Sequence, residues 1–460
     1  MTRFPAFAIM AVFGFAAISG PAAAEDLLQI YRDALASDPT LAAARSTYAA
    51  TQELLPQARS GLLPVLSLLG NASYTKFSET LHVKPAPVQP DCSTLPEPSC
   101  FDQRFPLYGY TVQAIQPLFR MQNWISFEQS KQQVGQGEYV YASAQQDLIV
   151  RVAQAYFDVL LAQFTIELTQ SQKAAVSENL AQAKRNFEVG VATITDTNDA
   201  QAKYDQIVAQ EISVQNDLAN KIAALRAIIG RNPKELKRVE RGFEPQLPAP
   251  NALEPWIEKA INDNYQVKIA QANFDIAGLE VDRQRAGHLP TLDLVASWNQ
   301  TYQGGAASTN VSANFAQDTR TGVIGVQLNV PLYTGGLVNS RVRQAVANLD
   351  AARQNLEAAR RAAQLLAQIS FAGVTSGVAQ VKALEQAVKS AVVSYDSNKL
   401  GLEVGVRTNL DVLNQQQQVF QTRFNLAQAY YNFVINALKL KQAAGTLSDE
   451  DVERINRELS

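Results

Sequence analysis

Two short segments carry the charged side chains that are best spaced for chemistry. They run from Glu188 to Asp196 and from Glu403 to Asp411, and both read Glu-Val-Gly-Val, one further residue, and Thr-x-x-Asp. Glycine suits a left-handed helix end, threonine suits the start of the next helix, and the helix dipole favours an acidic first turn. Each aspartate either caps its helix and does nothing else, or also presents a carboxylate at a hairpin tip. The predicted helix-end glycines and helix-start threonines are Gly190, Gly405, Thr193 and Thr408.

Enzyme chemistry is not indicated. The two histidines are His82, in a predicted loop, and His288, beside a proline that leads into a strand, so neither a Ser-His-Asp set nor a multi-histidine metal site can be assembled. No glycine-rich phosphate loop of the required form is present either. We therefore expect no catalysis, no metal and no cofactor.

The N-terminus has the features of a secretory signal peptide over residues 1–24. Arg3 precedes an apolar stretch that ends at Ile18, and small residues follow up to Ala24. No later stretch approaches 18 consecutive apolar residues, so a mature chain that enters a membrane would need a closed β-barrel. The two cysteines, Cys92 and Cys100, would bridge a loop in an oxidising compartment, with two free thiols as the alternative. The formal net charge of −3 gives no sign of a nucleic-acid partner.

The chain reads as one unit that has been duplicated. The residues around Pro64 recur around Pro290, those around Pro117 recur around Pro331, and the two segments described first follow in the same order. The duplication predicts a first repeat over 25–230, a connecting equatorial segment over 231–251, a second repeat over 252–445 and a C-terminal tail over 446–460.

Each repeat contains a predicted β-hairpin with one apolar and one polar face, over about 64–117 and about 290–331. The strands are expected to span about 10 residues each, with loops over 82–104 and 303–320. Aromatic residues end the apolar faces, which is typical of a girdle at a membrane interface. Four strands cannot close a barrel, so several chains must share one. Two chains would give a barrel filled by side chains, and three would leave room for an aqueous lumen. The girdle residues are Tyr74, Tyr108, Tyr110, Trp298 and Tyr302.

Long helical hairpins follow each pair of strands, over about 122–229 and 337–444. Their first helices exceed 60 residues, or roughly 100 Å. The helix that begins near Leu337 carries apolar residues at alternating steps of three and four, which is typical of a coiled coil. Shorter helices over 26–58 and 252–286 lead into the strands. The apolar stripe comprises Val342, Val346, Leu349, Ala352, Leu356, Ala359, Ala363 and Leu366.

The whole pattern resembles the TolC family of outer-membrane channels. The resemblance rests on the repeated order of strands and helices, the two tip segments, the start Glu25-Asp-Leu-Leu-Gln-Ile-Tyr and the close Ala443-Ala-Gly-Thr-Leu447. It implies an α+β membrane protein, a homotrimer with a 12-stranded β-barrel in outer-membrane lipid and a long periplasmic α-helical barrel of coiled-coil hairpins. It implies a duct that passively conducts drugs or secreted proteins from an inner-membrane ABC or RND-type transporter and a periplasmic adaptor protein.

The resemblance also implies roles for residues at the tips. Asp196 and Arg407 match residues of polar links that close the periplasmic end, and Asp411 matches one aspartate of an acidic ring at the narrowest point. Two positions depart from the family pattern: Leu402 replaces an aromatic hydroxyl, and Asn414 replaces a second ring aspartate. The adaptor and the transporter are expected to dock at the tips. The docking residues would be Gly190, Val191, Thr193, Gly405, Val406 and Thr408.

The alternative is a non-conducting, periplasm-spanning trimeric coiled-coil structural protein. It would explain the long helices, but not the duplication of a whole unit with polar, lumen-type strand faces. Conductance distinguishes the two. Within the channel class, the lack of a lipid-anchor cysteine near Ala24 favours the secretion branch.

Overall fold

A computed structural model of the chain describes residues 24–80, 100–237, 245–308 and 311–458. The described chain forms two compact units, which we treat separately. The sheet unit comprises Ala43–Ser143 and Ile261–Ala363, and the tip unit comprises the rest. The long helices α4 (Met121–Glu188) and α8 (Leu337–Glu403) contribute to both units.

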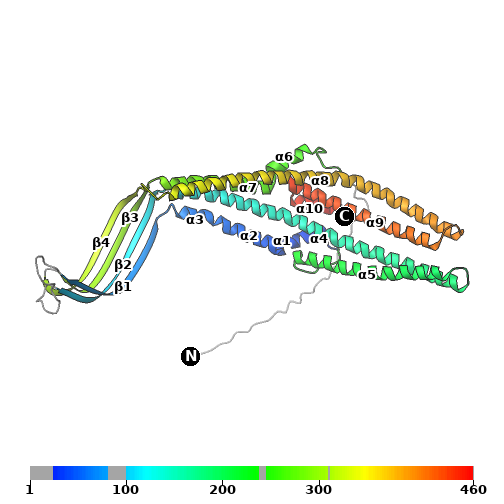
Figure 1. Ribbon diagram of the computed structural model, residues 1–460, viewed down its shortest axis with the longest axis horizontal. Coiled ribbons are helices and arrows are strands. Elements are labelled where there is room, and N and C mark those ends of the chain that lie inside the picture. Colours follow the sequence, from blue (N-terminus) through cyan, green and yellow to red (C-terminus); the bar gives the residue numbers. More distant parts are fainter. Residues whose placement is uncertain (1–23, 81–99, 238–244, 309–310, 459–460) are drawn as a thin grey trace, which may run out of the picture. The chain divides into compact units, whose positions relative to one another are not determined.

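The sheet unit contains one four-stranded antiparallel sheet in the order β1-β2-β3-β4 (Figure 1). Its middle pair, β2 with β3, joins the two sequence repeats directly. Leu66, Ala114, Ala296 and Ile324 lie in one cross-strand row, so the apolar faces of all four strands coincide. The strands are β1 (Val65–Thr80), β2 (Cys100–Phe119), β3 (Thr291–Ser308) and β4 (Val311–Asn329).

The strands are longer than predicted, at 16 to 20 residues. The predicted loop over 303–320 is wrong, because β3 and β4 remain paired through it, for example at Gln303 and Gln317. The ladder is made by backbone groups, so polar and glycine-rich residues can extend it where no core needs to be covered. Cys100 is the first residue of β2, whereas Cys92 and His82 lie outside the described residues, as does the predicted bridge between the cysteines.

One face of the sheet carries a band of exposed aliphatic side chains. Leu66 is 73% exposed and Ile324 is 78% exposed in the single chain. At one end of the band, the rings of Tyr108 and Tyr302 stack with centroids 4.6 Å apart. An aliphatic band with an aromatic edge is typical of the lipid-facing surface of a transmembrane barrel.

A buried ion pair fixes the point where β2 leads into α4. The Arg120 guanidinium donates to both carboxylate oxygens of Asp293 on β3, over 2.8 and 2.6 Å. The Asp293 side chain is only 10% exposed, so this bidentate contact is shielded from solvent. It holds the start of the long helix against the neighbouring strand.

The predicted helices over 26–58 and 252–286 are interrupted. Asp38 is extended and precedes Pro39, so α1 (Leu27–Ser37) ends there and α2 (Pro39–Gln52) begins. Asn264 caps a new helix by accepting from the Gln266 backbone N–H at 2.9 Å. The first segment ends with α3 (Leu54–Ser60), and the second comprises α6 (Glu254–Asp263), α7 (Tyr265–Arg285) and the 3-10 turn η1 (Ala286–His288).

Two helical hairpins form the tip unit: α4 with α5 (Ile194–Ile229), and α8 with α9 (Asn409–Ala443) (Figure 1). Val176 of α4, Ile207 of α5 and Leu413 of α9 form a buried cluster that joins the hairpins. Lys173 of α4 also lies 2.6 Å from Glu211 of α5. The two tips are therefore held in one packed body.

The apolar stretches of α4 and α8 are partly buried by helix packing. By length and composition alone both helices could cross a membrane. Neither helix contains 18 consecutive apolar residues. Polar residues interrupt their apolar runs, and part of each apolar window is buried against neighbouring helices. Of the predicted stripe on α8, Leu356 and Ala363 are buried, whereas Val346 and Leu366 are exposed in the single chain.

The two ends of the described chain pack into the tip unit. Glu25 is 1% exposed and pairs with Leu236 in a parallel bridge, and its carboxylate lies 2.9 Å from Arg231. At the other end, residues 449–458 form a helix, α10 (Asp449–Glu458), that the predicted tail did not include. Its Asp449 accepts from the Tyr31 hydroxyl at 2.6 Å, which ties it to α1.

Candidate functional site

The two hairpin tips turn through the same backbone geometry. Gly190 and Gly405 have φ angles of 77° and 76°, a region that glycine enters without strain. The following residues close each turn, because Val191 N–H donates to the Asn186 carbonyl and Val406 N–H donates to the Gly401 carbonyl, both at 2.9 Å. These are Schellman turns, and they confirm the predicted helix-end glycines.

Each tip then restarts with a reciprocal capping box. The Asp196 N–H donates to the Thr193 hydroxyl oxygen at 3.3 Å, and the Thr193 N–H donates to the Asp196 carboxylate at 2.9 Å. The corresponding distances for Asp411 and Thr408 are 3.2 and 3.0 Å. Both predicted N-caps are confirmed, and the capping function of both aspartates is real.

The caps also set the charge of the tips. The Thr193 backbone N–H, and then its hydroxyl, lower the pKa of the Asp196 carboxyl below its ordinary value. The Thr408 backbone N–H and hydroxyl lower the pKa of Asp411 in the same way, with a smaller contribution from the Arg407 charge. Both carboxylates are therefore ionised at neutral pH, and the tips carry fixed negative charge.

Apolar side chains surround these charges. Val189, Val191, Val404 and Val406 are between 65% and 74% exposed, and Ile194 is 52% exposed. Exposed apolar side chains that gather at one place, rimmed by polar groups, are typical of a protein interaction surface. The tips thus combine a short apolar surface with ionised carboxylates.

Arg407 distinguishes the second tip from the first. Its side chain lies across the backbone of Gly401, since a Cβ atom built on Gly401 would stand 2.7 Å from Arg407 Cγ. The aligned positions of the first tip are Asn186 and Ala192. Gly401 was not singled out from the sequence. The sequence does contain a signal for it. Glycine stands at the position aligned with Asn186, one helical turn before Gly405.

The predicted link between Asp196 and Arg407 is not made within one chain. Among the described residues Arg407 forms no ion pair, and Asp196 bonds to Thr193. Asn414 is exposed one turn after Asp411 and next to the buried Leu413. A link of this kind would therefore have to join two chains.

Two further sequence expectations concern Leu402 and metal binding. Leu402 is partly buried, on the helix that leads into the second tip. Among the residues that the structure describes, no group of three or more His, Cys, Asp or Glu side chains could hold a metal ion.

Comparison with known proteins identifies the fold and the family. The family model described as outer membrane efflux protein matches residues 30–231 and 256–446, one match for each sequence repeat. The outer membrane protein TolC of Vibrio cholerae is 33% identical over 433 residues, covering 94% of this chain and 93% of that protein. The proteases secretion protein PrtF of Dickeya chrysanthemi is 29% identical, covering 95% of this chain and 91% of that protein.

The crystal structure of the Campylobacter jejuni CmeC outer membrane channel has the same fold. It superposes with a TM-score of 0.75 at 16% identity, over 95% of this chain and 89% of that chain. The predicted fold class is confirmed, and the non-conducting coiled coil is not supported by these relatives. The chain belongs to the outer membrane efflux protein family, as a TolC-type exit duct of the outer membrane.

Proposed function

We propose that the hairpin tips form the gate of this duct, with three chains placing their tips around one axis. The observation that carries the proposal is the difference between the tips. Arg407, which forms no ion pair among the described residues, stands where the first tip has Ala192, and the Asp196 carboxylate of the first tip is ionised and exposed. In a homotrimer the second tip of one chain would meet the first tip of the next. Arg407 would then bridge to Asp196 of the neighbouring chain.

Such links would close the duct without locking it. Exposed ion pairs contribute little stability each, because water and salt screen both charges. Three equivalent links act together, yet a partner that binds the open tips better can release them without unfolding any helix. The buried cluster of Val176, Ile207 and Leu413 would stay intact while the tips move.

Asp411 would line the narrowest point of the closed duct. Three ionised carboxylates around a narrow axis attract cations and repel anions. Asn414, one turn further along α9, supplies no second ring of charge. We therefore expect cation selectivity that is weaker than two acidic rings would give.

The apolar tip surface would receive a periplasmic adaptor protein, which in turn recruits an inner-membrane transporter of the ABC or RND type. The docking surface would include Gly190, Val191, Thr193, Gly405, Val406 and Thr408. The valines are exposed in the described structure, and the two turns present them in the same geometry. The similarity to PrtF, a protein named for protease secretion, along 95% of the chain supports secreted proteins as cargo.

Single-channel conductance in a planar bilayer tests the gate. Purified wild-type trimer should show a small cation-selective conductance, and Arg407→Ser should raise it several-fold because three links are lost together. Ala192→Ser, at the aligned position of the first tip, is the matched control and should leave conductance unchanged. Equal conductance in wild type and Arg407→Ser, with the trimer verified in both, would overturn the gate assigned to Arg407.

A further inference from the structure

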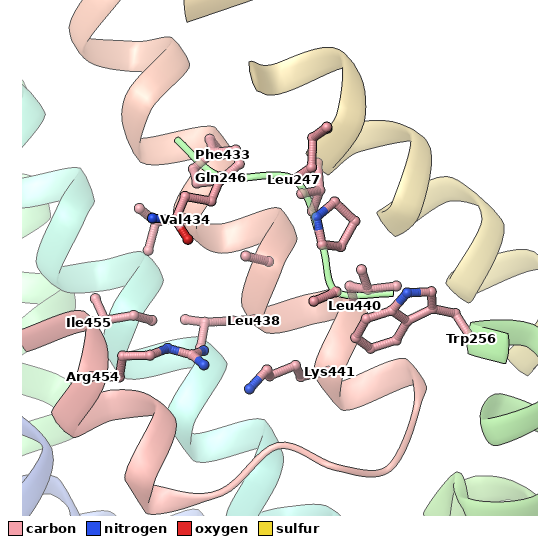
Figure 2. A pocket seen from close by; sticks show the side chains of 14 residues that line it. Gln246, Leu247, Trp256, Phe433, Val434, Leu438, Leu440, Lys441, Arg454 and Ile455 are labelled. Atoms are coloured by element: carbon pink, nitrogen blue, oxygen red, sulfur yellow. The ribbon is translucent and has the colours of Figure 1, made fainter. Parts of the chain in front are cut away.

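The tip unit contains a cavity of about 610 Å³ that the duct function does not use. Its walls come from residues 246–249 of the connecting segment, Trp256 of α6, Val374 of α8, and parts of α9 and α10 (Figure 2). This volume is within the usual range for sites that bind small organic molecules. Every lining residue belongs to the same compact unit.

Most of the wall is apolar and its shape is fixed by packing. Trp256 is 7% exposed, and its indole N–H donates to the Pro250 carbonyl at 3.0 Å, so the polar edge of the ring is already satisfied. Phe433, Leu438 and Ile455 are buried and also line the cavity. The apolar body of a ligand can therefore lie against this part of the wall without breaking the hydrogen bond of the indole.

The charged side chains that line the cavity are both cationic. Figure 2 shows Lys441 and Arg454 at one end, with Phe433 and Leu247 at the opposite end. Both cations bond to the same Asp451 oxygen, at 3.0 Å for Arg454. One carboxylate balances one of the two positive charges, so these three bonded side chains together keep one net positive charge.

Arg454 has hydrogen-bond capacity to spare. Its side chain is 49% exposed, and one guanidinium nitrogen bonds to Asp451, whereas guanidinium carries five N–H donors in a fixed fork. A ligand carboxylate or sulfonate could accept from the remaining donors while Asp451 stays bound. Charge-assisted bonds of this kind are about twice as strong as neutral ones.

We propose that this cavity binds a small amphipathic organic anion. Its carboxylate or sulfonate would lie against Arg454 and Lys441, and its apolar body would lie against Trp256, Leu438 and Ile455. The proposal stands on the cavity and its charge, and it does not depend on how the tips open.

Isothermal titration calorimetry of the intact mature trimer, held in amphipol, tests the proposal with two matched probes. The anion 2-naphthoate should bind once per chain. The neutral isostere 2-naphthamide should bind about tenfold more weakly, because it loses the charge-assisted bonds. Equal binding of the two probes would overturn the proposed anion recognition.

Two variants locate the site. Ala437→Phe places a ring in the cavity and should abolish binding of both probes. Arg454→Gln alters a half-exposed side chain and should reduce the preference for naphthoate to about twofold. Lys439→Gln removes the same charge from α9 at a residue outside the cavity wall, and should bind as wild type.

Two other outcomes would contradict the proposal. Unchanged binding by Ala437→Phe would overturn the location. No heat from either probe with the folded trimer, at two temperatures, would also overturn the proposal.

Discussion

The two hairpin tips share a backbone and differ in four side chains that matter. Both have a left-handed glycine, a Schellman turn and a Thr-Asp capping box. The first tip has Asn186, Ala192, Asn198 and Asp199 where the second has Gly401, Arg407, Leu413 and Asn414. The shared features build both tips, and in the proposed gate the shared aspartates act together with Arg407, which only the second tip has.

The differences also give the two hairpins different packing contacts and different charges. Leu413 lets α9 pack against Val176 and Ile207 of the other hairpin, whereas the aligned Asn198 is exposed. Arg407 stands one residue before its helix restarts and lies over Gly401. The second tip thus carries both the inter-hairpin packing and the cation.

The largest effect is expected when Gly401 is replaced by alanine. The added Cβ would lie 2.7 Å from Arg407 Cγ, so the arginine must leave its place while its charge is retained. We expect a several-fold rise in single-channel conductance, approaching that of Arg407→Ser. Alanine is more favourable than glycine in a helix by about 1 kcal/mol. Destabilisation of the helix therefore cannot explain a rise in conductance.

Asn186→Ala is the matched control in the first tip and should leave conductance unchanged. Wild-type conductance from Gly401→Ala would show that Arg407 reaches its partner without support from Gly401. The single-channel conductance of Arg407→Ser would then remain the test of the gate itself.

A smaller effect is expected on ion selectivity. Asp411→Asn should lower the cation-to-anion permeability ratio by about threefold, and Asn414→Asp should raise it by a similar factor, since each changes one ring of three charges. Reversal potentials under a salt gradient give this ratio. Asp199→Asn, at the first-hairpin position aligned with Asn414, should have little effect, and an equal loss of selectivity there would remove the distinction between the hairpins.

Local sequence rules predicted the tips well because their geometry is made by neighbours in the chain. Glycine at Gly190 and threonine three residues on, at Thr193, specify the turn and the cap through contacts within a few residues. The same reasoning missed Gly401, because its importance depends on where a side chain six residues later is placed. The family resemblance, rather than any rule of spacing, supplied the roles of Asp196, Arg407 and Asp411.

Longer-range features were predicted less well. The strands extend beyond their apolar stretches because backbone pairing continues without a core, as at Gln303. The helix α10 was missed because its ten residues are mostly charged, and it is held by contacts to distant parts of the chain such as Tyr31. The walls of the cavity beside Trp256 come from five separate segments of the chain, so no local sequence pattern predicts it.

A modest and equal effect is expected when either cap is removed. Thr193→Ala and Thr408→Ala each lose the hydroxyl that accepts from the aspartate N–H, at a cost of about 1 kcal/mol to the first helical turn. Amide hydrogen exchange at the two tips should accelerate about fivefold in each case. Thr195→Ala, at the second residue of α5 and without a bond in the capping box, serves as the control. A much larger effect at one tip would mean that the shared caps are not equivalent.

The smallest effect is expected from pH. The folded-state pKa values of Asp196 and Asp411 lie below the ordinary value of 3.8, so the stability that their ionised forms give the tips is fully present above that value. It should be lost as pH falls through the lowered values. Amide protection at the tips, corrected for intrinsic exchange, should be flat from pH 7 to about pH 5 and should decline only below that range.

The same titration separates the tips, because Arg407 lowers the pKa of Asp411 and has no counterpart beside Asp196. Arg407→Ser should therefore raise the pH at which the second tip loses protection, and it should leave the first tip unchanged. Asp196→Asn and Asp411→Asn should each flatten the profile of their own tip only. The same second-tip midpoint in Arg407→Ser and in the wild type would show that Arg407 exerts no field on its own tip.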